Sequence, residues 1–188
     1  IFVYEFNPIA LTLTERGKED VSTGLMALDF AGGYVYALNE DAAAQFMVID
    51  VISSSTPALV ATSSLPYAPT GVGRSIYYYD KKVYVGTQYL PCVLCAPEQN
   101  HEFHVFDVTS PTSPNWLGSF NINNNINDIA VSGNYAYLAT SGDDRELVVL
   151  NISNPASITW VGTFDAADTL SGIGEDVTSL YLLVNKIY

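Results

Sequence analysis

Basic residues are scarce in this chain. It has 7 lysines and arginines against 20 aspartates and glutamates, which gives a formal net charge of −13 over 188 residues. A protein that binds nucleic acid or an anionic membrane surface needs positive charge, so the composition argues against both kinds of partner. No apolar run approaches the length that spans a bilayer, so we expect no membrane insertion by this segment.

The motifs of common enzyme classes are also missing. There is no G-x-S-x-G and no H-E-x-x-H, and "GVGRS" (71–75) lacks the spacing and the lysine of a phosphate-binding loop. The adjacent acids Asp143-Asp144 and Glu175-Asp176 could form an acid and base pair, but neighbouring acids usually just face water. We therefore expect a protein that is not an enzyme, with a hydrolase-type enzyme as the second alternative.

Helical patterns are absent as well, and what remains is typical of strands. Charged residues make up only 14% of the chain, 13 residues are tyrosine, and β-branched residues recur throughout. This mixture suits pleated, half-buried strands better than helices. A chain of this length is expected to be one domain.

An internal repeat organises the chain. "DVTSPTSPNWLGSF" (107–120) aligns without a gap with "NISNPASITWVGTF" (151–164), and "DVISSSTPALVATS" (50–63) fits the same frame more weakly. The period is about 45 residues with one enlarged unit. Self-similarity at this period is typical of propellers and other repeat architectures.

Each unit predicts four short strands, which we label A to D. In the clearest unit these are "INDIAVS", "YAYLAT", "LVVLNI" and "WVGTF", separated by Gly-Asn and Asn-Pro turn sequences. The strand C segments "FMVIDV", "FHVFDV" and "LVVLNI" are apolar at both parities, which predicts that both of their faces are covered. Stacked blades of a propeller cover strands in this way.

Residues 126–164 carry a family resemblance. This segment resembles the LVIVD repeat, with a "GNYAYLA"-like strand followed by an "LxVxDxSNPxxPxxVG"-like stretch, and the other units match in part. The resemblance implies a β-propeller of a bacterial or archaeal secreted or cell-surface protein. It carries no general activity and no catalytic motif.

The predicted fold is therefore an all-β propeller of four-stranded antiparallel blades in a single domain, 1–188. Blades are expected at about 24–64, 71–120 and 126–164, which we number 1 to 3, with half-blades at 1–15 and 171–188. We expect the half-blades to pair and close a four-bladed ring, because closure removes exposed sheet edges. The alternative is an arc cut from a larger propeller.

Acidic residues gather in the predicted B–C and D–A loops, which emerge on one face of a propeller. Twelve of the 20 acids fall there: Glu15, Glu19, Asp20, Glu40, Asp41, Glu98, Glu102, Asp143, Asp144, Glu146, Asp165 and Asp168. One interpretation is that these loops are merely solvated. The other is a partner-binding face, for which we select Glu40, Asp41, Asp143, Asp144, Asp165 and Asp168, and which could hold a basic partner or a Ca²⁺ assembled across loops.

One loop holds both cysteines and both histidines. Cys92, Cys95, His101 and His104 offer a tetrahedral Zn²⁺ set, although His104 falls in strand C and the two histidines are spaced to point to opposite faces. A redox role would need an activating setting that an all-β loop does not supply. A Cys92–Cys95 disulfide is consistent with the secreted context that the resemblance implies, and free thiols are a further alternative.

Three functions are compatible with these patterns. We expect a non-catalytic binding or adhesion module, extracellular or at the cell surface, whose partner is a protein or a carbohydrate. The alternative is a structural subunit of a surface appendage or filament that assembles with copies of itself, and the third is the enzyme above. No cofactor is expected, Zn²⁺ and Ca²⁺ being the ions that the residues could hold.

Overall fold

The computed structural model describes residues 1–21, 24–41, 43–68, 73–91, 100–165, 178–183 and 186–187. In these residues three antiparallel sheets have four strands each, with neighbours in sequence order, and two further sheets have two strands each. Blade 1 has β3 (Leu25–Ala31), β4 (Tyr34–Asn39), β5 (Phe46–Asp50) and β6 (Ala58–Ser63). Blade 2 has β7 (Gly73–Tyr79), β8 (Lys82–Thr87), β9 (Phe103–Asp107) and β10 (Asn115–Phe120). Blade 3 has β11 (Ile126–Ser132), β12 (Tyr135–Thr140), β13 (Leu147–Asn151) and β14 (Thr159–Phe164).

The two-stranded sheets lie beside the outer blades. They are β1 (Phe2–Asn7) with β2 (Thr12–Lys18), and β15 (Leu182–Leu183) with β16 (Lys186–Ile187). The only helical turn in the described residues is the 3-10 turn η1 (Pro155–Ser157) between β13 and β14. No helix of that part of the chain is long and apolar enough to span a membrane.

Tight turns join strands A and B of each blade. Gly32 and Gly33 have φ values of 60° and 84°, and Asp80 and Lys81 have 46° and 59°. Two central residues with positive φ are the signature of the hairpin turn that matches the right-handed twist of its strands. Gly133, at the third A–B turn, also has a positive φ of 56°.

The core lies between blades, as the strand C pattern predicts. The strands β5 and β9 are buried at four consecutive positions, so both of their faces are covered. Phe46 of blade 1 stacks on Phe106 of blade 2 with 4.6 Å between ring centroids. Blades 2 and 3 share a second cluster that includes Phe103, Ile126 and Leu138. The predicted all-β propeller-type fold is confirmed.

A bulge recurs in strand D and is followed by a small residue. After the register shift, Gly17, Ala61, Gly118 and Gly162 stand opposite a valine of strand C. A side chain at Gly118 would collide with the backbone of Pro155, and one at Gly17 would lie 2.6 Å from the carbonyl O of Ser54. In both cases the obstacle is the C–D turn of the following blade, so close packing of blades requires the small residue.

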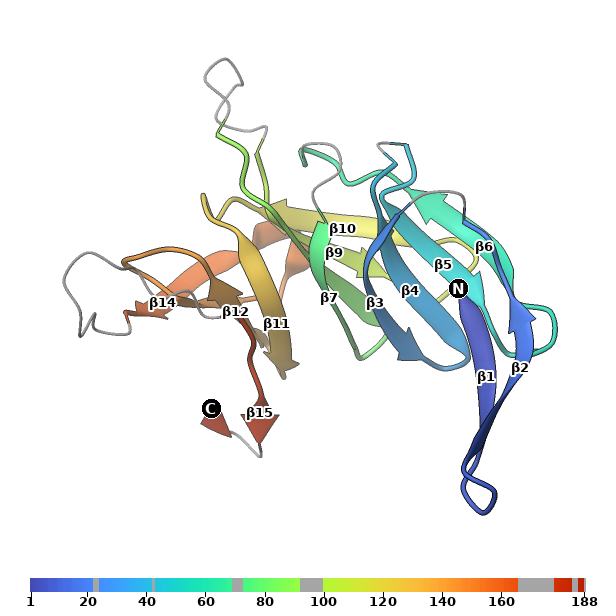
Figure 1. Ribbon diagram of the computed structural model, residues 1–188. Helices are drawn as coiled ribbons and strands as arrows, with labels where there is room; N and C mark the ends of the chain where they lie inside the picture. The colour runs from blue at the N-terminus through green and yellow to red at the C-terminus, as the bar shows by residue number, and fades with distance from the viewer. Residues whose placement is uncertain are drawn as a thin grey trace.

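The blades form an open arc (Figure 1). The predicted pairing of the terminal half-blades does not form in the described residues, because β1 pairs with β2 and β15 pairs with β16. The β1–β2 hairpin packs on blade 1 at Gly17, whereas the backbone N–H of Leu180 donates to Asp128 of blade 3 at 2.8 Å. The two half-blades are thus held at opposite ends of the row of blades, and the described residues show the arc.

Candidate functional site

The strand ends place three B–C loops on one end of the molecule. A side chain at Gly73, where β7 begins, would meet Leu38 near the end of β4, and one at Gly86, near the end of β8, would meet Ile126, where β11 begins. Gly73 also pairs with the end of β8, and Ile126 with the end of β12. The ends of β4, β8 and β12 therefore lie on the same side. We call this side the loop face: the described parts of the B–C loops 40–45, 88–102 and 141–146 and of the D–A loops 64–72 and 121–125.

The acids predicted for partner binding are exposed where the structure describes them. Glu40 and Asp41 follow β4, Asp143 and Asp144 follow β12, and Asp165 follows β14. Asp168 lies outside the described residues. The strand ends thus bring Glu40 and Asp41 to the same face as Asp143 and Asp144, although these pairs belong to different blades.

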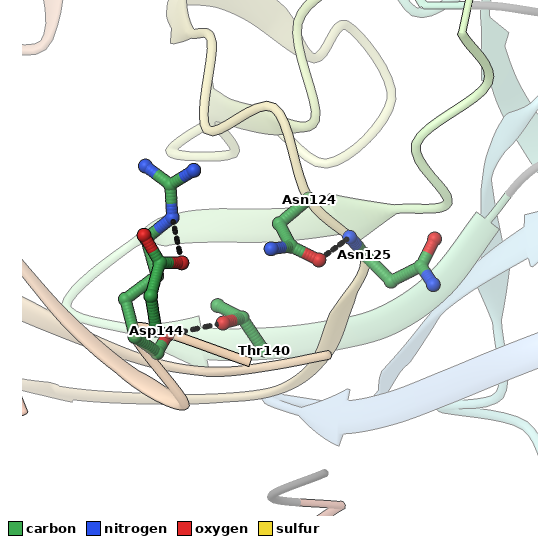
Figure 2. Close-up of polar contacts among 5 residues, drawn as sticks. Asn124, Asn125, Thr140 and Asp144 are labelled. Atoms are coloured by element: carbon green, nitrogen blue, oxygen red, sulfur yellow. Dashed lines mark hydrogen bonds and ion pairs between the residues drawn. The ribbon is translucent and has the colours of Figure 1, made fainter. Parts of the chain in front are cut away.

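Polar contacts connect the loops around Asn125. Its backbone N–H donates to Oδ1 of Asn124 at 3.0 Å (Figure 2). Its carbonyl O accepts from the N–H of Ser141 at 3.3 Å, and its side-chain oxygen accepts from the N–H of Tyr89 at 2.9 Å. Loops of blades 2 and 3 and the segment between them thus converge on one residue. Such contacts give the loop face a defined shape.

Within the blade 3 loop, the acids stand on a short braced turn. The hydroxyl of Thr140 donates to the carbonyl O of Arg145 at 2.6 Å, and Asp144 forms an ion pair with the Arg145 guanidinium at 3.2 Å (Figure 2). Asp143, next to this pair, is exposed. Its carboxylate is therefore presented to solvent by a turn that is fixed at its base.

Two acids predicted for this face are instead buried, and this corrects the sequence analysis. Glu102 and Glu146 are buried at the start of strand C, where blade 1 has Gln45. Glu102 Oε2 accepts from the N–H groups of Ile122 and Asn123 at 2.8 and 3.0 Å, just as Gln45 Oε1 accepts from Leu65 at 2.9 Å. Glu102 and Gln45 thus each tie a B–C loop to the following D–A loop. Their shared repeat position, directly before strand C, was the signal that could have revealed this.

Burial decides the protonation of Glu102. Desolvation raises the pKa of its carboxyl to about 7, although the two backbone N–H donors oppose this shift.

The position predicted for Glu15 is also wrong, because this residue lies in β2 opposite Tyr4 and not in a loop.

The histidines of the cysteine-containing loop both contact the protein. Nε2 of His104 lies 2.8 Å from the carbonyl O of His101, and Nδ1 of His101 lies 2.5 Å from the hydroxyl of Ser119. Burial lowers the pKa of His104 to about 4 and also lowers that of His101, so both imidazoles are neutral at pH 7. Cys92 and Cys95 lie outside the described residues, so the disulfide and the four-ligand zinc site both stay predictions. In the part of the chain that is described, no three His, Cys, Asp or Glu side chains group as a metal site.

This loop is nine residues longer than its counterpart in blade 1, because it spans 88–102 and the blade 1 loop spans 40–45. A comparison of sequences that sets Val85 against Tyr36 would make the difference eight, but Tyr36 pairs with Val48 and Tyr84 pairs with the equivalent Val105. Tyr84 is therefore the counterpart of Tyr36. Sequence similarity between two alternating strands does not fix the register to one residue.

An aromatic groove opens beside the loop face. Its volume is about 540 Å³, and it is lined by Tyr67, His101, Trp116, Leu117, Gly118, Ser119 and Ala156. The ring centroid of Tyr67 lies 5.3 Å from that of His101 and 6.1 Å from that of Trp116. Tyr67 is 51% exposed and has a φ of 66°, a conformation that bulky residues rarely adopt. No sequence pattern identifies Tyr67, because it lies outside the repeated strands.

The stacked four-stranded sheets define an all-β protein of propeller type. Residues 125–166 match the family model of the LVIVD repeat. This confirms the resemblance for the unit that carries blade 3. A search of curated proteins finds no match.

Solved structures share the fold at low sequence identity. The computationally designed Ika4 protein is 16% identical, with a TM-score of 0.61 over 91% of this chain and 87% of that chain. The designed Ika8 protein is 12% identical, with a TM-score of 0.62 over 95% of this chain and 46% of that chain. A functionally unknown protein from Desulfotomaculum acetoxidans is 12% identical, with a TM-score of 0.60 over 87% of this chain and 49% of that chain. The chain spans about half the length of the last two.

Proposed function

We propose that this chain is a non-catalytic binding module that engages a basic protein partner through the loop face. One observation carries the proposal: the strands β4, β8 and β12 all end on the same side of the molecule. Exposed carboxylates from separate blades therefore lie on one face. Clustered charge of one sign raises the association rate with a partner of opposite charge and selects against partners of the same charge. The LVIVD resemblance supports a place outside the cell or at its surface.

The residue chemistry of the described chain supports binding over catalysis. Both histidines are neutral at pH 7 and hold contacts inside the protein. The acids of the loop face are instead exposed, on turns whose bases are fixed by strand pairing and by Asn125. A rigid support with exposed charged loops is the usual arrangement of a recognition surface.

Charge removal on each face tests this proposal. Asp143→Asn removes one exposed charge from the loop face, and Asp80→Asn removes one from the opposite side, where asparagine tolerates the positive φ of the A–B turn. A decalysine peptide in low-salt buffer is the probe, with binding measured by calorimetry. Asp143→Asn is expected to weaken binding roughly twofold, as an exposed charge pair contributes 0–1 kcal/mol. Equal losses for both variants would show that the peptide does not select the loop face.

The aromatic groove supports a second candidate, carbohydrate binding. Tyr67 presents an exposed ring beside His101 and Trp116, and Ser119, which carries a hydroxyl, lines the same groove. Sugar rings have apolar faces that stack on aromatic side chains and hydroxyls that need polar partners. Tyr67 also has a left-handed backbone conformation, which is unfavourable for a bulky residue. Such strain is found most often at binding sites, where it holds a side chain in the orientation that the ligand needs.

Tryptophan fluorescence can test the groove, because Trp116 lines it. Chitotetraose and maltotetraose are titrated into the protein, and at least one is expected to change the emission with a saturable curve. Tyr67→Ala is expected to abolish that change. Tyr181→Ala, which removes another exposed tyrosine, is the matched control and should leave the curve intact. Unchanged titrations in Tyr67→Ala would reject the groove as the sugar site.

A further inference from the structure

Two of the contacts between neighbouring sheets use the same kind of seat. The small residue after the strand D bulge receives the C–D turn of the following blade: Gly17 receives the turn at Ser54–Pro57, and Gly118 receives the turn at Pro155–Ala156. A seat of this kind therefore predicts which element covers it. That element is a strand C and strand D hairpin.

The seat at Gly162 is open. A Cβ added there has nothing within 4 Å among the described residues, although Gly162 stands at the position of Gly17 and Gly118. Around this seat, the side chains of the described strands β13 and β14 are also more exposed than their counterparts. Leu147 and Val149 are partly exposed, whereas their counterparts Phe46 and Val48 in blade 1, and Phe103 and Val105 in blade 2, are fully buried. Phe164, on the same face, is 62% exposed.

The β1–β2 hairpin has an exposed face that could cover the open face of blade 3. The bulge register makes β1 equivalent to strand C, so that Phe2 and Tyr4 correspond to Met47 and Ile49 of blade 1. Those blade 1 side chains are buried towards the preceding sheet, but Phe2 and Tyr4 are 59% and 50% exposed. The face of β1–β2 that would contact a preceding blade is therefore bare and aromatic.

The tip of this hairpin also resembles the turn that fills the Gly118 seat. Asn7-Pro8 begins the tip, and Oδ1 of Asn7 accepts from the N–H groups of Ile9 and Ala10, both at 3.0 Å. In blade 3, Oδ1 of Asn154 likewise accepts from Ala156 after an Asn-Pro sequence. Ile9 at the tip is 95% exposed.

We propose that two copies of this chain join head to tail, with the β1–β2 hairpin of each copy docked on the blade 3 face around Gly162 of the other. A single copy in this conformation cannot make the contact itself, because the hairpin and β14 lie at opposite ends of the arc (Figure 1). Two copies have about the extent of one Ika8 chain, 46% of which this chain covers. Because the hairpin of each copy contacts the seat of the other, the two joints are related by a two-fold axis and the assembly closes at two copies.

Blocking the seat separates assembly from folding. Gly162→Arg is expected to leave the single copy folded, since the site is open and its φ is not in the left-handed region. Sedimentation velocity of the wild type is expected to show twice the mass of one chain at micromolar concentration. Gly162→Arg should raise the dimer dissociation constant at least tenfold. Thr163→Arg, on the other side of the same strand, is the matched control and should sediment like the wild type.

Mixing two defective chains tests the head-to-tail geometry. Tyr4→Arg blocks the hairpin face, and Gly162→Arg blocks the seat, so a mixture retains one intact joint per pair. We expect each variant alone to be a monomer and the equimolar mixture to form a one-to-one heterodimer. A monomeric wild type, a wild-type dimer unaffected by Gly162→Arg, a mixture without heterodimer, or particles that grow beyond two copies would each overturn the proposal.

Discussion

At the scale of single residues, one position in the repeat decides how the loops are held. Gln45 and Glu102 precede strand C, are buried, and accept from backbone N–H groups of the following D–A loop. Gln45 accepts these bonds without a charge, whereas burial raises the pKa of the Glu102 carboxyl to about 7. The same geometry therefore depends on pH in blade 2.

The variant Glu102→Gln should reduce the pH dependence of stability. Because the folded pKa of about 7 exceeds the ordinary value of 4.5, the stabilising contribution of this group is complete below pH 4.5 and is lost as the pH rises through 7. At pH 8 the variant is expected to recover on the order of 2 kcal/mol in the free energy of unfolding. Urea denaturation at pH 5 and pH 8 measures the difference. The exposed Glu40→Gln is the control, and an identical pH profile in Glu102→Gln would contradict the assignment.

Residue types alone could not identify this buried acid. A glutamate in a polar loop is expected to be exposed, and only its alignment with Gln45 across blades indicates burial. The acids Glu40, Asp41, Asp143 and Asp144 do not occupy the last position of their loops, next to strand C, and they are exposed. Tyr67 was missed for a different reason, since its contacts with His101 and Trp116 join residues far apart in the chain.

At the scale of strands and sheets, the sequence was most informative. The alignment of 107–120 with 151–164 places Gly118 with Gly162, and the register of β10 and β14 confirms this pairing. Apolar residues at both odd and even positions correctly predicted covered strands, because such a strand needs cover on both faces, and stacked sheets supply it in this all-β chain. The alignment of 50–63 also places Ala61 with Gly118. The equivalence of Gly17 was not visible, because Gly17 follows its partner Val3 by 14 positions whereas Ala61 follows Val48 by 13.

The blade seats predict unequal effects of one substitution at two equivalent glycines. Gly118→Val would force the C–D turn at Pro155 away from β10 and is expected to cost about 2 kcal/mol or more in the free energy of unfolding. Gly162→Val has open space and should change it by less than about 0.5 kcal/mol. Both are measured by denaturation at nanomolar concentration, where single copies prevail. Equal losses would mean that β10 is not packed as described.

At the scale of the whole molecule, the sequence predicted the kind of fold but not its closure. Closure depends on the angle between successive blades, which is set by many small packing differences and by no single motif. The β1–β2 hairpin is held on blade 1 by the packing of Gly17 against the turn at Ser54. The segment at Leu180 is held on blade 3 by its hydrogen bond to Asp128, so the two half-blades lie apart. The expectation of a closed ring came from the cost of exposed sheet edges. A second copy that covers these edges removes the same cost.

Salt should separate the two interaction surfaces proposed for this chain. Two copies that each carry a net charge of −13 repel one another, and the joint at Gly162 is apolar, so raising NaCl from about 20 to about 500 mM is expected to strengthen the dimer. Binding of decalysine to the loop face should weaken over the same range. Sedimentation equilibrium and calorimetry measure the two trends, and a dimer that weakens with salt would point to a charged joint.

The base of each B–C loop is closed by the same hydrogen bond whatever the loop contains. The N–H of Asn39 donates to Gln45, that of Thr87 to Glu102, and that of Thr140 to Glu146, at 2.9, 2.9 and 2.8 Å. Lengthening such a loop from five to fourteen residues costs only about 1 kcal/mol of closure entropy. The blade therefore serves as a platform for foreign peptides: an epitope or an affinity tag inserted between Asp143 and Asp144 would be displayed at the surface while the strands beneath it keep their register.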